Sequence, residues 1–299
     1  MKFNDIDFLI IGAGKSATTW LQTQLQSDPD VYMPDPELHF FSRVYDRGAD
    51  WYLTQFDDAA CGRTIGEKSN SYLYTKDAAA RIYRTLPHIQ LIAQLRNPVE
   101  RAYSNYCMLF RRGEVGADIA KHLEPSQAGE DKLLMSGQYA SHLQQFVDLY
   151  GREKLLILFF EGVKRDPKEQ MAKVRAHLGL RPRPLALDVG KKVKDKSAPN
   201  IPAKWSKRLQ WMKPVVHPLR GTAAFETARG WLAREIYYPE LPDDLRDRLI
   251  DYYMPSIVAL EAMSGQSLAH WYETPVKTAQ TETLSRFSQD LGKRHPRPS

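Results

Sequence analysis

The turn from Gly12 to Thr19 limits the possible folds, because an apolar strand pattern precedes it and an amphipathic helix pattern follows it. Before it, the run from Phe8 to Ile11 is wholly apolar, which is typical of a buried parallel strand. After it, residues 16–26 place their large apolar side chains on one helical face. A glycine-containing turn between such elements directs backbone N–H groups and a helix dipole at an anion. The segment therefore predicts an α/β fold with an anion-binding turn near its N-terminus.

Alternating strand and helix patterns continue along most of the chain. They favour a P-loop-like open parallel sheet with helices on both faces and a helical C-terminal region. The polar stretches 28–41 and 113–131 are expected to be loops. The further strands are expected at 63–67, 89–95 and 154–160, and the helices at 77–85, from Pro98 onward, and at 137–150, 167–178 and 243–263.

Residues 1–275 are expected to form one domain, followed by a polar and disordered tail at 276–299. Within the domain the segment 181–235 is unusual. From residue 181 to 220 it carries eleven Lys or Arg against two Asp, whereas the whole chain has a net charge of only +6. A local excess of this kind favours an anionic ligand over general nucleic-acid binding; a solvated basic loop is the other interpretation.

Composition excludes several classes of protein. The two cysteines, Cys61 and Cys107, stand in unrelated contexts, so neither a disulfide scaffold nor a cysteine-based zinc site is expected. No apolar run reaches the length of about 18 residues that a membrane span needs. Residues 1–7 show no signal-peptide pattern. We therefore expect a cytoplasmic protein.

Three ligand classes fit the glycine turn to different degrees. A Walker A loop would need a glycine where Leu9 stands. A dinucleotide fingerprint is formally matched, but the segment 28–34 is a poor candidate for the strand and acid that should follow. Lys15 and its neighbouring hydroxyls better suit a single phosphate that carries a further anionic group. The structural alternative is a strand–helix turn whose hydroxyls cap the helix.

Five segments, in a consistent order, resemble those of sulfotransferases that use 3′-phosphoadenosine 5′-phosphosulfate (PAPS), in particular the heparan-type and related bacterial carbohydrate branch. The resemblance runs from about residue 6 to 180 and resumes near 243–271. The basic loop at 191–202 matches only loosely and 205–235 has no counterpart, which leaves the acceptor open. The five segments are 8–21, 36–41, 67–72, 95–106 and 137–143.

Arg96 stands where an apolar strand ends, which is where ligands bind in open α/β sheets. Its guanidinium can bind a phosphate through two parallel hydrogen bonds, and Ser104 can donate a hydroxyl to the same anion. A surface arginine that closes a strand is the alternative. The resemblance implies that both residues hold the 3′-phosphate of PAPS, and Lys196 is expected to add a cation from the basic segment. It also implies that the 5′-phosphosulfate is held by Gly14, Lys15, Ser16, Ala17, Thr18 and Thr19.

Glu37 and His39 come directly before Phe40 and Phe41. A carboxyl beside two aromatic rings is expected to have a raised pKa, which suits a general base; a loop acid exposed to water is the alternative. The resemblance implies that Glu37 deprotonates the acceptor. His39 is expected to orient Glu37 or the acceptor.

Lys68 and His142 complete the candidate catalytic residues. Lys68 follows an expected strand, and the resemblance implies a role near the sulfuryl group or the acceptor. His142 lies one helical turn after Tyr139, although a lone histidine on a helix is usually structural. A solvated side chain is the alternative for Lys68.

Together these assignments predict in-line transfer of a sulfuryl group to a hydroxyl or amine of a saccharide, glycoconjugate or polar metabolite. Lys15 would neutralise the oxygen that leaves, and no metal is expected, because neither a carboxylate pair nor a zinc motif is visible. Trp51, Tyr72 and Tyr74 are expected to stack on sugar faces. A sulfotransferase for small non-sugar molecules, a P-loop nucleotide kinase and a nucleotide sensor are the alternatives.

Overall fold

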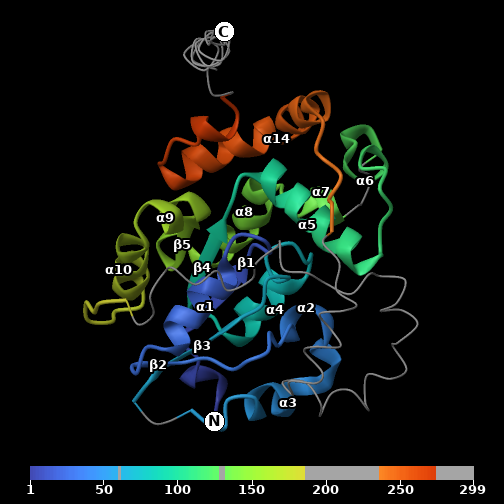
Figure 1. The fold of residues 1–299 in the computed structure, drawn as a ribbon. Helices are drawn as coiled ribbons and strands as arrows, with labels where there is room; N and C mark the ends of the chain where they lie inside the picture. Colours follow the sequence, from blue (N-terminus) through green and yellow to red (C-terminus); the bar gives the residue numbers. More distant parts are fainter. Residues whose placement is uncertain (60–61, 128–131, 186–235, 274–299) are drawn as a thin grey trace, which may run out of the picture.

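The computed structural model describes residues 1–59, 62–127, 132–185 and 236–273. Within these ranges, five parallel strands form one sheet in the order β2-β3-β1-β4-β5 (Figure 1). Because all strands are parallel, their carboxyl ends meet along one edge, where open α/β sheets bind ligands. The strands are β1 (Phe8–Gly12), β2 (Val31–Tyr32), β3 (Thr64–Lys68), β4 (Gln90–Leu95) and β5 (Leu155–Phe159).

The central strand β1 is buried along its whole length. Phe8 pairs with Gly66 on β3 and with Gln90 on β4. A Cβ atom on Gly66 would lie 2.4 Å from the ring of Phe8, so only glycine allows this close approach.

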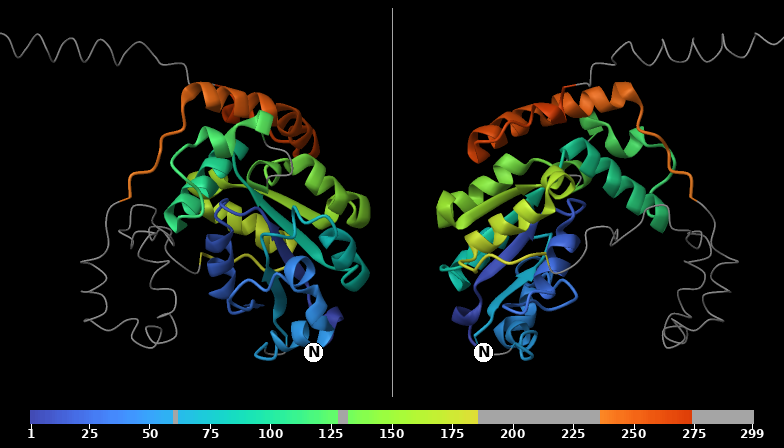
Figure 2. Two further views of the ribbon diagram at one scale, coloured as in Figure 1. Left: turned by 90° about the vertical axis from the view of Figure 1, so that its right-hand side faces the viewer. Right: turned by 60° about the vertical axis from the view of Figure 1, so that its left-hand side comes forward.

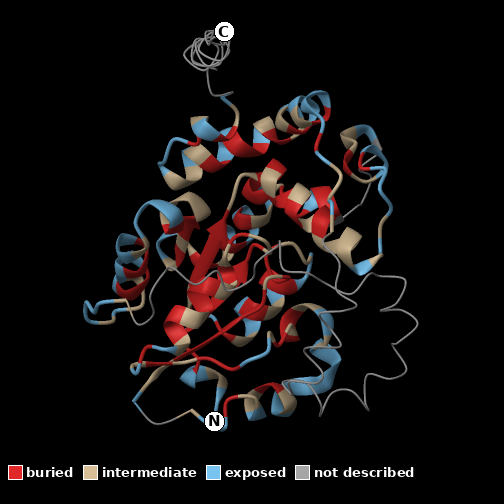
Figure 3. Ribbon diagram, viewed as in Figure 1, coloured by how far each residue is buried: buried red, intermediate tan, exposed pale blue. Residues whose placement is uncertain are grey.

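Successive residues of β1 pack on opposite faces of the sheet. Leu9 and Ile11 belong to the larger hydrophobic core, whereas Phe8 and Ile10 belong to a smaller one. The larger core is completed by α4 (Ala78–Thr85), α5 (Pro98–Arg112), α8 (Tyr139–Tyr150) and α14 (Asp243–Ser264), and the smaller one by α1 (Thr18–Gln26), α9 (Phe160–Arg165) and α10 (Pro167–His177). Helices therefore cover both faces, as predicted, and the sheet between them is buried (Figures 2 and 3).

The junction between β4 and α5 anchors the C-terminal part of the chain. The side chain of Asn97 caps α5 by accepting hydrogen bonds from the backbone N–H groups of Val99 and Glu100. Its Nδ2 donates to the carbonyl of Trp271, 2.8 Å away. Helix α14 packs against α8 and α5, so the predicted helical C-terminal region is confirmed and lies over the larger core (Figure 1).

Several short elements differ from the expected loops. Residues 31–32 form the two-residue strand β2, which is too short to give an alternating pattern. Helix α2 (Phe40–Arg43) begins within one expected loop and α6 (Ala120–Leu123) lies within the other, while α3 (Gly48–Thr54) lies in a segment for which no element was predicted. Helix α7 (Lys132–Met135) precedes α8. Single 3₁₀ turns occur at Phe3–Asp5, Tyr45–Arg47, Pro125–Gln127, Arg152–Lys154 and Ala269–Trp271.

Most of the basic segment 181–235 and all of the tail at 276–299 lie outside the described residues, so their expected roles stay predictions. Among the helices that the structure does describe, none combines the length and the apolarity that crossing a membrane requires.

Candidate active site

The turn between β1 and α1 has the backbone of an anion-binding loop. Lys15 and Ala17 both adopt left-handed conformations, with φ of 72° and 64°. Such conformations are unfavourable for residues other than glycine and concentrate at functional sites. Ala17 is the N-cap of α1, and no side chain accepts a capping hydrogen bond there. The hydroxyls of this turn therefore do not cap the helix, contrary to the structural alternative.

The turn that follows β3 packs directly on the glycine turn. The N–H groups of Ser69 and Leu73 donate to the carbonyls of Ile10 and Ile11 at 3.0 and 2.9 Å. A Cβ on Gly12 would lie 2.9 Å from Cβ of Leu73, so Gly12 permits this contact. The end of β3 is thereby held beside the glycine turn.

Lys15 and Arg96 lie on neighbouring elements of this edge. Nζ of Lys15 lies 2.9 Å from Sδ of Met108 on α5, and a guanidinium nitrogen of Arg96 donates to the carbonyl of Lys15 at 3.5 Å. Gln94 on β4 donates to the carbonyl of Ser16 at 2.6 Å. The strand end that carries Arg96 therefore borders the turn that carries Lys15.

The side chain of Arg96 is mostly buried, and its carboxylate contact within the described residues is a long one to Glu100. It lies 3.4 Å from Oε2 of Glu100, whose other oxygen binds Arg246 of α14 at 2.7 Å. It also lies over the ring of Phe160, 4.9 Å from the centroid. Ser104 is buried on α5, two turns beyond the strand end. A long contact to a shared carboxylate leaves the guanidinium able to bind a stronger anion.

Glu37 lies against the end of β3 and the turn after it. Its Oε1 binds Nζ of Lys68 at 2.9 Å and Nδ2 of Asn70 at 2.9 Å. Its Oε2 accepts the backbone N–H of Asn70 at 3.0 Å and lies 3.7 Å from Nε2 of His39. The structure thus brings Glu37, His39 and Lys68, three of the candidate catalytic residues, into contact.

The pKa of Glu37 is lowered, and the expectation of a raised pKa was wrong. Burial does raise it, but the charge of Lys68 and the hydrogen bonds from Asn70 and Lys68 outweigh burial. The two aromatic rings do not decide the outcome, because the carboxylate has a cation and two N–H donors of its own. Glu37 is therefore ionised at neutral pH.

His39 is held at its ring and at both ends of its backbone. Nδ1 lies 2.7 Å from Oγ of Ser71, and the backbone N–H donates to Oγ of Ser69 at 2.8 Å. Ser42 donates to its carbonyl at 3.2 Å. Burial and the nearby charge of Arg43 lower the pKa of His39, so the ring is neutral at neutral pH. The backbone of His39 is left-handed, with φ of 54°, so the chain turns between Glu37 and Phe41 instead of running extended.

The sulfotransferase domain family matches residues 5–213, well over half of the chain and including every site residue described above. The chain belongs to the sulfotransferase family. Enzymes of this family take the sulfuryl group from PAPS, and the kinase alternative is therefore wrong.

Named relatives agree with this assignment. Heparan sulfate glucosamine 3-O-sulfotransferase 6 of Homo sapiens is 31% identical over 187 residues, covering 58% of this chain and 52% of that protein. The human bifunctional heparan sulfate N-deacetylase/N-sulfotransferase 3 is 30% identical over 194 residues, which are 22% of its length. The aligned part of this chain spans about half the length of the first relative and about a fifth of the length of the second. A sulfotransferase crystal structure from Alicyclobacillus acidocaldarius has the same fold, with a TM-score of 0.68, 24% identity and coverage of 90% and 99% of the two chains.

The residues at the carboxyl-end edge of the sheet have the chemistry that binding of PAPS requires. A left-handed turn, a helix N-terminus and Lys15 converge where a phosphosulfate would need backbone donors and a cation. Arg96 supplies a second cation at the adjacent strand end. Among the described residues, no group of three or more His, Cys, Asp or Glu could hold a metal ion.

One buried acid of this sulfotransferase was missed in the sequence. Glu67 is only 1% exposed and accepts hydrogen bonds from the hydroxyls of Tyr72, Tyr52 and Ser69. Burial raises its pKa to about 7, although these three hydroxyls lower it. The sequence signal that could have revealed this residue is the position of a glutamate within β3, which is otherwise expected to be buried.

Three further predicted residues, His142, Tyr72 and Trp51, are held by contacts with residues other than Glu37. His142 is on α8, and its Nε2 lies 2.9 Å from the carbonyl of Met135; burial lowers its pKa. Lys196 lies outside the described residues. Tyr72 is fully buried with its hydroxyl on Glu67, so it does not stack on a sugar as expected. Trp51 is half-buried, with Arg47 4.6 Å above its ring.

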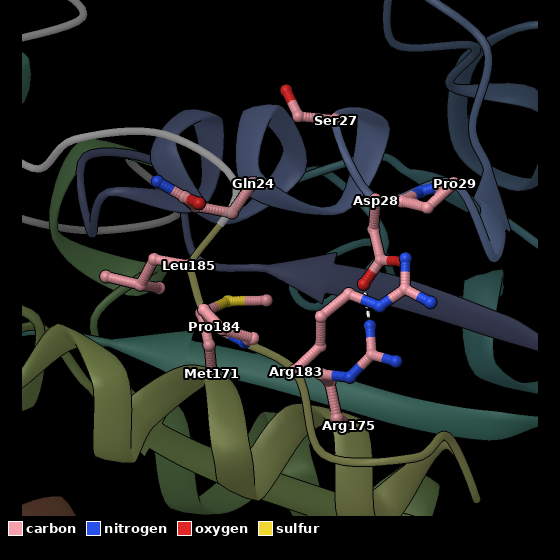
Figure 4. Close-up of a pocket in the computed structure, with 9 residues that line it drawn as sticks. All are labelled: Gln24, Ser27, Asp28, Pro29, Met171, Arg175, Arg183, Pro184 and Leu185. Carbon is pink, nitrogen blue, oxygen red and sulfur yellow. Dashed lines mark ion pairs between the residues drawn. The ribbon is translucent and has the colours of Figure 1, made fainter.

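A pocket of about 300 Å³ lies at the far end of α1 from the glycine turn (Figure 4). Arg175 on α10 forms ion pairs across it with Asp28 and Asp30, and Arg183 pairs with Asp30 at 3.2 Å. In the close-up, Asp28 and Arg175 point toward each other. None of the predicted site residues lines this pocket, and its opposing charges satisfy one another.

Proposed function

We propose that this chain transfers a sulfuryl group from PAPS to a hydroxyl or amine of a saccharide or related polar acceptor. The observation that carries the proposal is the position of Glu37. Its carboxylate is bound by Lys68 and Asn70, and Asn70 also lies beside Gly14, where an added Cβ would be 3.9 Å from the Cβ of Asn70. Asn70 therefore lies between the proposed base, Glu37, and the glycine turn that would bind the donor.

Glu37 is the proposed general base. Oε1 already accepts two hydrogen bonds, from Lys68 and Asn70, whereas Oε2 accepts one, from the backbone of Asn70. A carboxylate oxygen offers about two acceptor sites, so Oε2 keeps one for the acceptor proton. Oε2 also faces His39, which fits a role for this neutral imidazole in orienting the acceptor.

Lys15 and Arg96 are the proposed donor-binding cations. In the transfer, a bond forms between the acceptor oxygen or nitrogen and sulfur, the sulfur–oxygen bond to the phosphate breaks, and Glu37 takes the acceptor proton. Lys15 would neutralise the charge that appears on the phosphate oxygen, which is where pre-positioned cations lower the barrier. Arg96 and Ser104 would hold the 3′-phosphate, away from the reacting atoms.

A saccharide acceptor is supported by the relatives and by the surface beside Glu37. Both named relatives are described as acting on heparan sulfate. Arg43, Arg47 and Arg81 lie on α2 and its neighbours, with Arg47 over Trp51 and Arg81 4.7 Å above the ring of Tyr45. Aromatic rings with polar rims and the exposed side chains of Arg43 and Arg47 suit an acidic sugar chain.

A transfer assay tests the proposal. The protein is incubated with sulfur-labelled PAPS and matched acceptors: a desulfated heparan fragment, a neutral oligosaccharide, a small phenol and a short aliphatic alcohol. We expect label in a saccharide, and a KM for the acidic fragment that rises with salt. Faster labelling of the phenol or alcohol would refute the saccharide acceptor but keep the sulfotransferase. No labelling of any acceptor, with tight binding of adenosine 3′,5′-bisphosphate, would favour a sensor.

A further inference from the structure

Glu67 is a buried carboxyl that the proposed reaction does not use. It stands next to Lys68 on β3, and three hydroxyl groups point at it. Tyr72 donates to Oε1 at 2.5 Å, Tyr52 donates to the same oxygen at 3.3 Å, and Ser69 donates to Oε2 at 2.8 Å. Three donors around one carboxyl suit its ionised form, since a carboxylate is an acceptor only.

Ser69 links Glu67 to the segment that carries the base. A serine hydroxyl has one proton, and here Ser69 gives it to Glu67. Its oxygen then accepts the backbone N–H of His39 at 2.8 Å. Ser69 is itself fixed to β1, because its N–H donates to the carbonyl of Ile10. The path from Glu67 through Ser69 therefore reaches the backbone two residues after Glu37.

The hydrogen bonds to Nδ1 and the carbonyl of His39 are made by uncharged groups, while Oε2 of Glu37 lies 3.7 Å from its Nε2. Ser71 binds its Nδ1 at 2.7 Å and also lies 2.6 Å from Oγ of Ser42, which donates to the His39 carbonyl. Glu67 is thus the ionisable group at the buried end of a hydrogen-bonded chain that runs through Ser69 to the backbone of His39. A change in its charge polarises this branch of the chain, separately from protonation of the His39 ring.

We propose that Glu67 is a positioning residue for Glu37, acting through Ser69 and the backbone of His39. This inference rests on the proposed function. The ionised carboxyl accepts the Ser69 proton and so strengthens the bond that Ser69 accepts from His39. The protonated carboxyl must itself donate to one of its three partners. The hydrogen bond from Ser69 to Glu67 then becomes weaker or changes direction, and the bond from His39 to Ser69 weakens with it.

The groups that face Glu67 set the pH at which this change occurs. The Tyr52 and Tyr72 hydroxyls approach from α3 and from the turn after β3, and the charge of Glu37 acts from the segment before α2. Burial raises the pKa of Glu67 to about 7, the hydroxyls lower it, and Glu37 raises it further. Both protonation states are therefore populated near neutral pH, and their proportion depends on the hydroxyl bonds.

The first test needs no substrate. The backbone amide of His39 is followed by nitrogen–proton NMR from pH 5.5 to 8.5 in the wild-type chain, Glu67→Gln and Tyr72→Phe. We expect a titration with its midpoint near 7 in the wild type, distinct from the one below 6.5 that belongs to the imidazole of His39. Glu67→Gln should abolish the upper titration and keep the lower one. Tyr72→Phe should move the upper one to higher pH, because a bond to the charged form is lost. An upper titration that persists in Glu67→Gln would overturn the inference.

The second test is kinetic. In the wild type, kcat/KM for the acceptor should rise through an ionisation near pH 7. That ionisation should be absent in Glu67→Gln, with turnover at pH 8 lowered about 10- to 100-fold, the scale expected for a misplaced catalytic group. Affinity for adenosine 3′,5′-bisphosphate should stay within about twofold, since the donor site is untouched. Unchanged turnover and pH profile in Glu67→Gln would overturn the positioning role. A wild type that transfers no sulfuryl group would refute the proposed function instead, and the NMR titration would still decide the link from Glu67 to His39.

Discussion

Nζ of Lys68 lies 2.9 Å from Oε1 of Glu37, and this contact joins the end of β3 to the segment before α2. The lysine side chain is only 3% exposed, whereas that of Glu37 is 25% exposed. A buried cation needs a partner, so Lys68 and Glu37 fix each other in place. The same contact is the main attractive charge that keeps Glu37 ionised.

Replacing Lys68 should therefore change the pH dependence of turnover. Lys68→Met keeps the length of the side chain and removes its charge, so burial should raise the pKa of Glu37 with less opposition. In a Glu67→Gln background, which lacks the ionisation near pH 7, the acidic limb of kcat/KM reports Glu37 and should move to higher pH when Lys68 is replaced, as measured in buffers of constant ionic strength. An acidic limb that stays in place on this replacement would show that another group is the base.

Arg96→Ala should weaken binding of adenosine 3′,5′-bisphosphate. Loss of one charged hydrogen-bonded pair is worth about 1.5–3 kcal/mol, or roughly a 10- to 150-fold rise in Kd by calorimetry. Adenosine 5′-phosphate, which lacks the 3′-phosphate, is the matched control and should bind both proteins alike. Equal affinity of the two proteins for the bisphosphate would contradict the assignment of Arg96.

Lys15→Ala should lower kcat more than it lowers donor affinity. The charge that Lys15 is proposed to neutralise develops mainly as the sulfur–oxygen bond breaks, so the lost contact belongs to the transition state. We expect kcat to fall about 10²- to 10³-fold, the scale for one such group. Lys168→Ala, at an exposed position on α10, serves as the control. Parallel losses in kcat and in bisphosphate affinity would instead make Lys15 a simple binding residue.

Glu67→Gln should change how stability depends on pH. The pKa of Glu67 is raised from 4.5 to about 7 by folding, so the folded state holds the proton more tightly than the unfolded chain does. The wild type therefore loses stability as pH rises from 4.5 to about 7, and a glutamine does not. In urea unfolding from pH 5 to 8, the free energy of unfolding of Glu67→Gln relative to the wild type should rise by up to about 3 kcal/mol and level off above pH 7. A constant difference between the two proteins would show that Glu67 has an ordinary pKa.

The centre of the sheet was predictable because β1, β4 and β5 are five or six residues long and mostly apolar. The runs at residues 8–12 and 90–95 are buried over their whole length or nearly so, and prolines and glycines mark where the neighbouring helices begin and end. The two-residue strand β2 and the short helix α2 were not predictable, because neither is long enough to show a period. They exist through pairing with β3 and through burial of Phe40 and Phe41.

The candidate site was predictable in its members but less so in its electrostatics. Glu37, His39 and Lys68 were grouped through a resemblance of ordered segments, and the structure places them in contact. The sign of the Glu37 pKa shift was wrong, because Lys68 and Asn70 come from a segment thirty residues away that sequence proximity does not reveal. Glu67 was missed for the same reason: the tyrosines that surround it come from α3 and from the turn after β3.

Turnover of Glu37→Gln tests the central claim most directly. The substitution keeps the shape of the side chain and removes its ability to take a proton. Transfer of labelled sulfuryl group from PAPS to the best acceptor should fall about 10²- to 10⁴-fold, the contribution of a positioned general base, with the Kd for adenosine 3′,5′-bisphosphate unchanged. Near-normal transfer by Glu37→Gln, with the same bisphosphate affinity, would show that Glu37 is not the base.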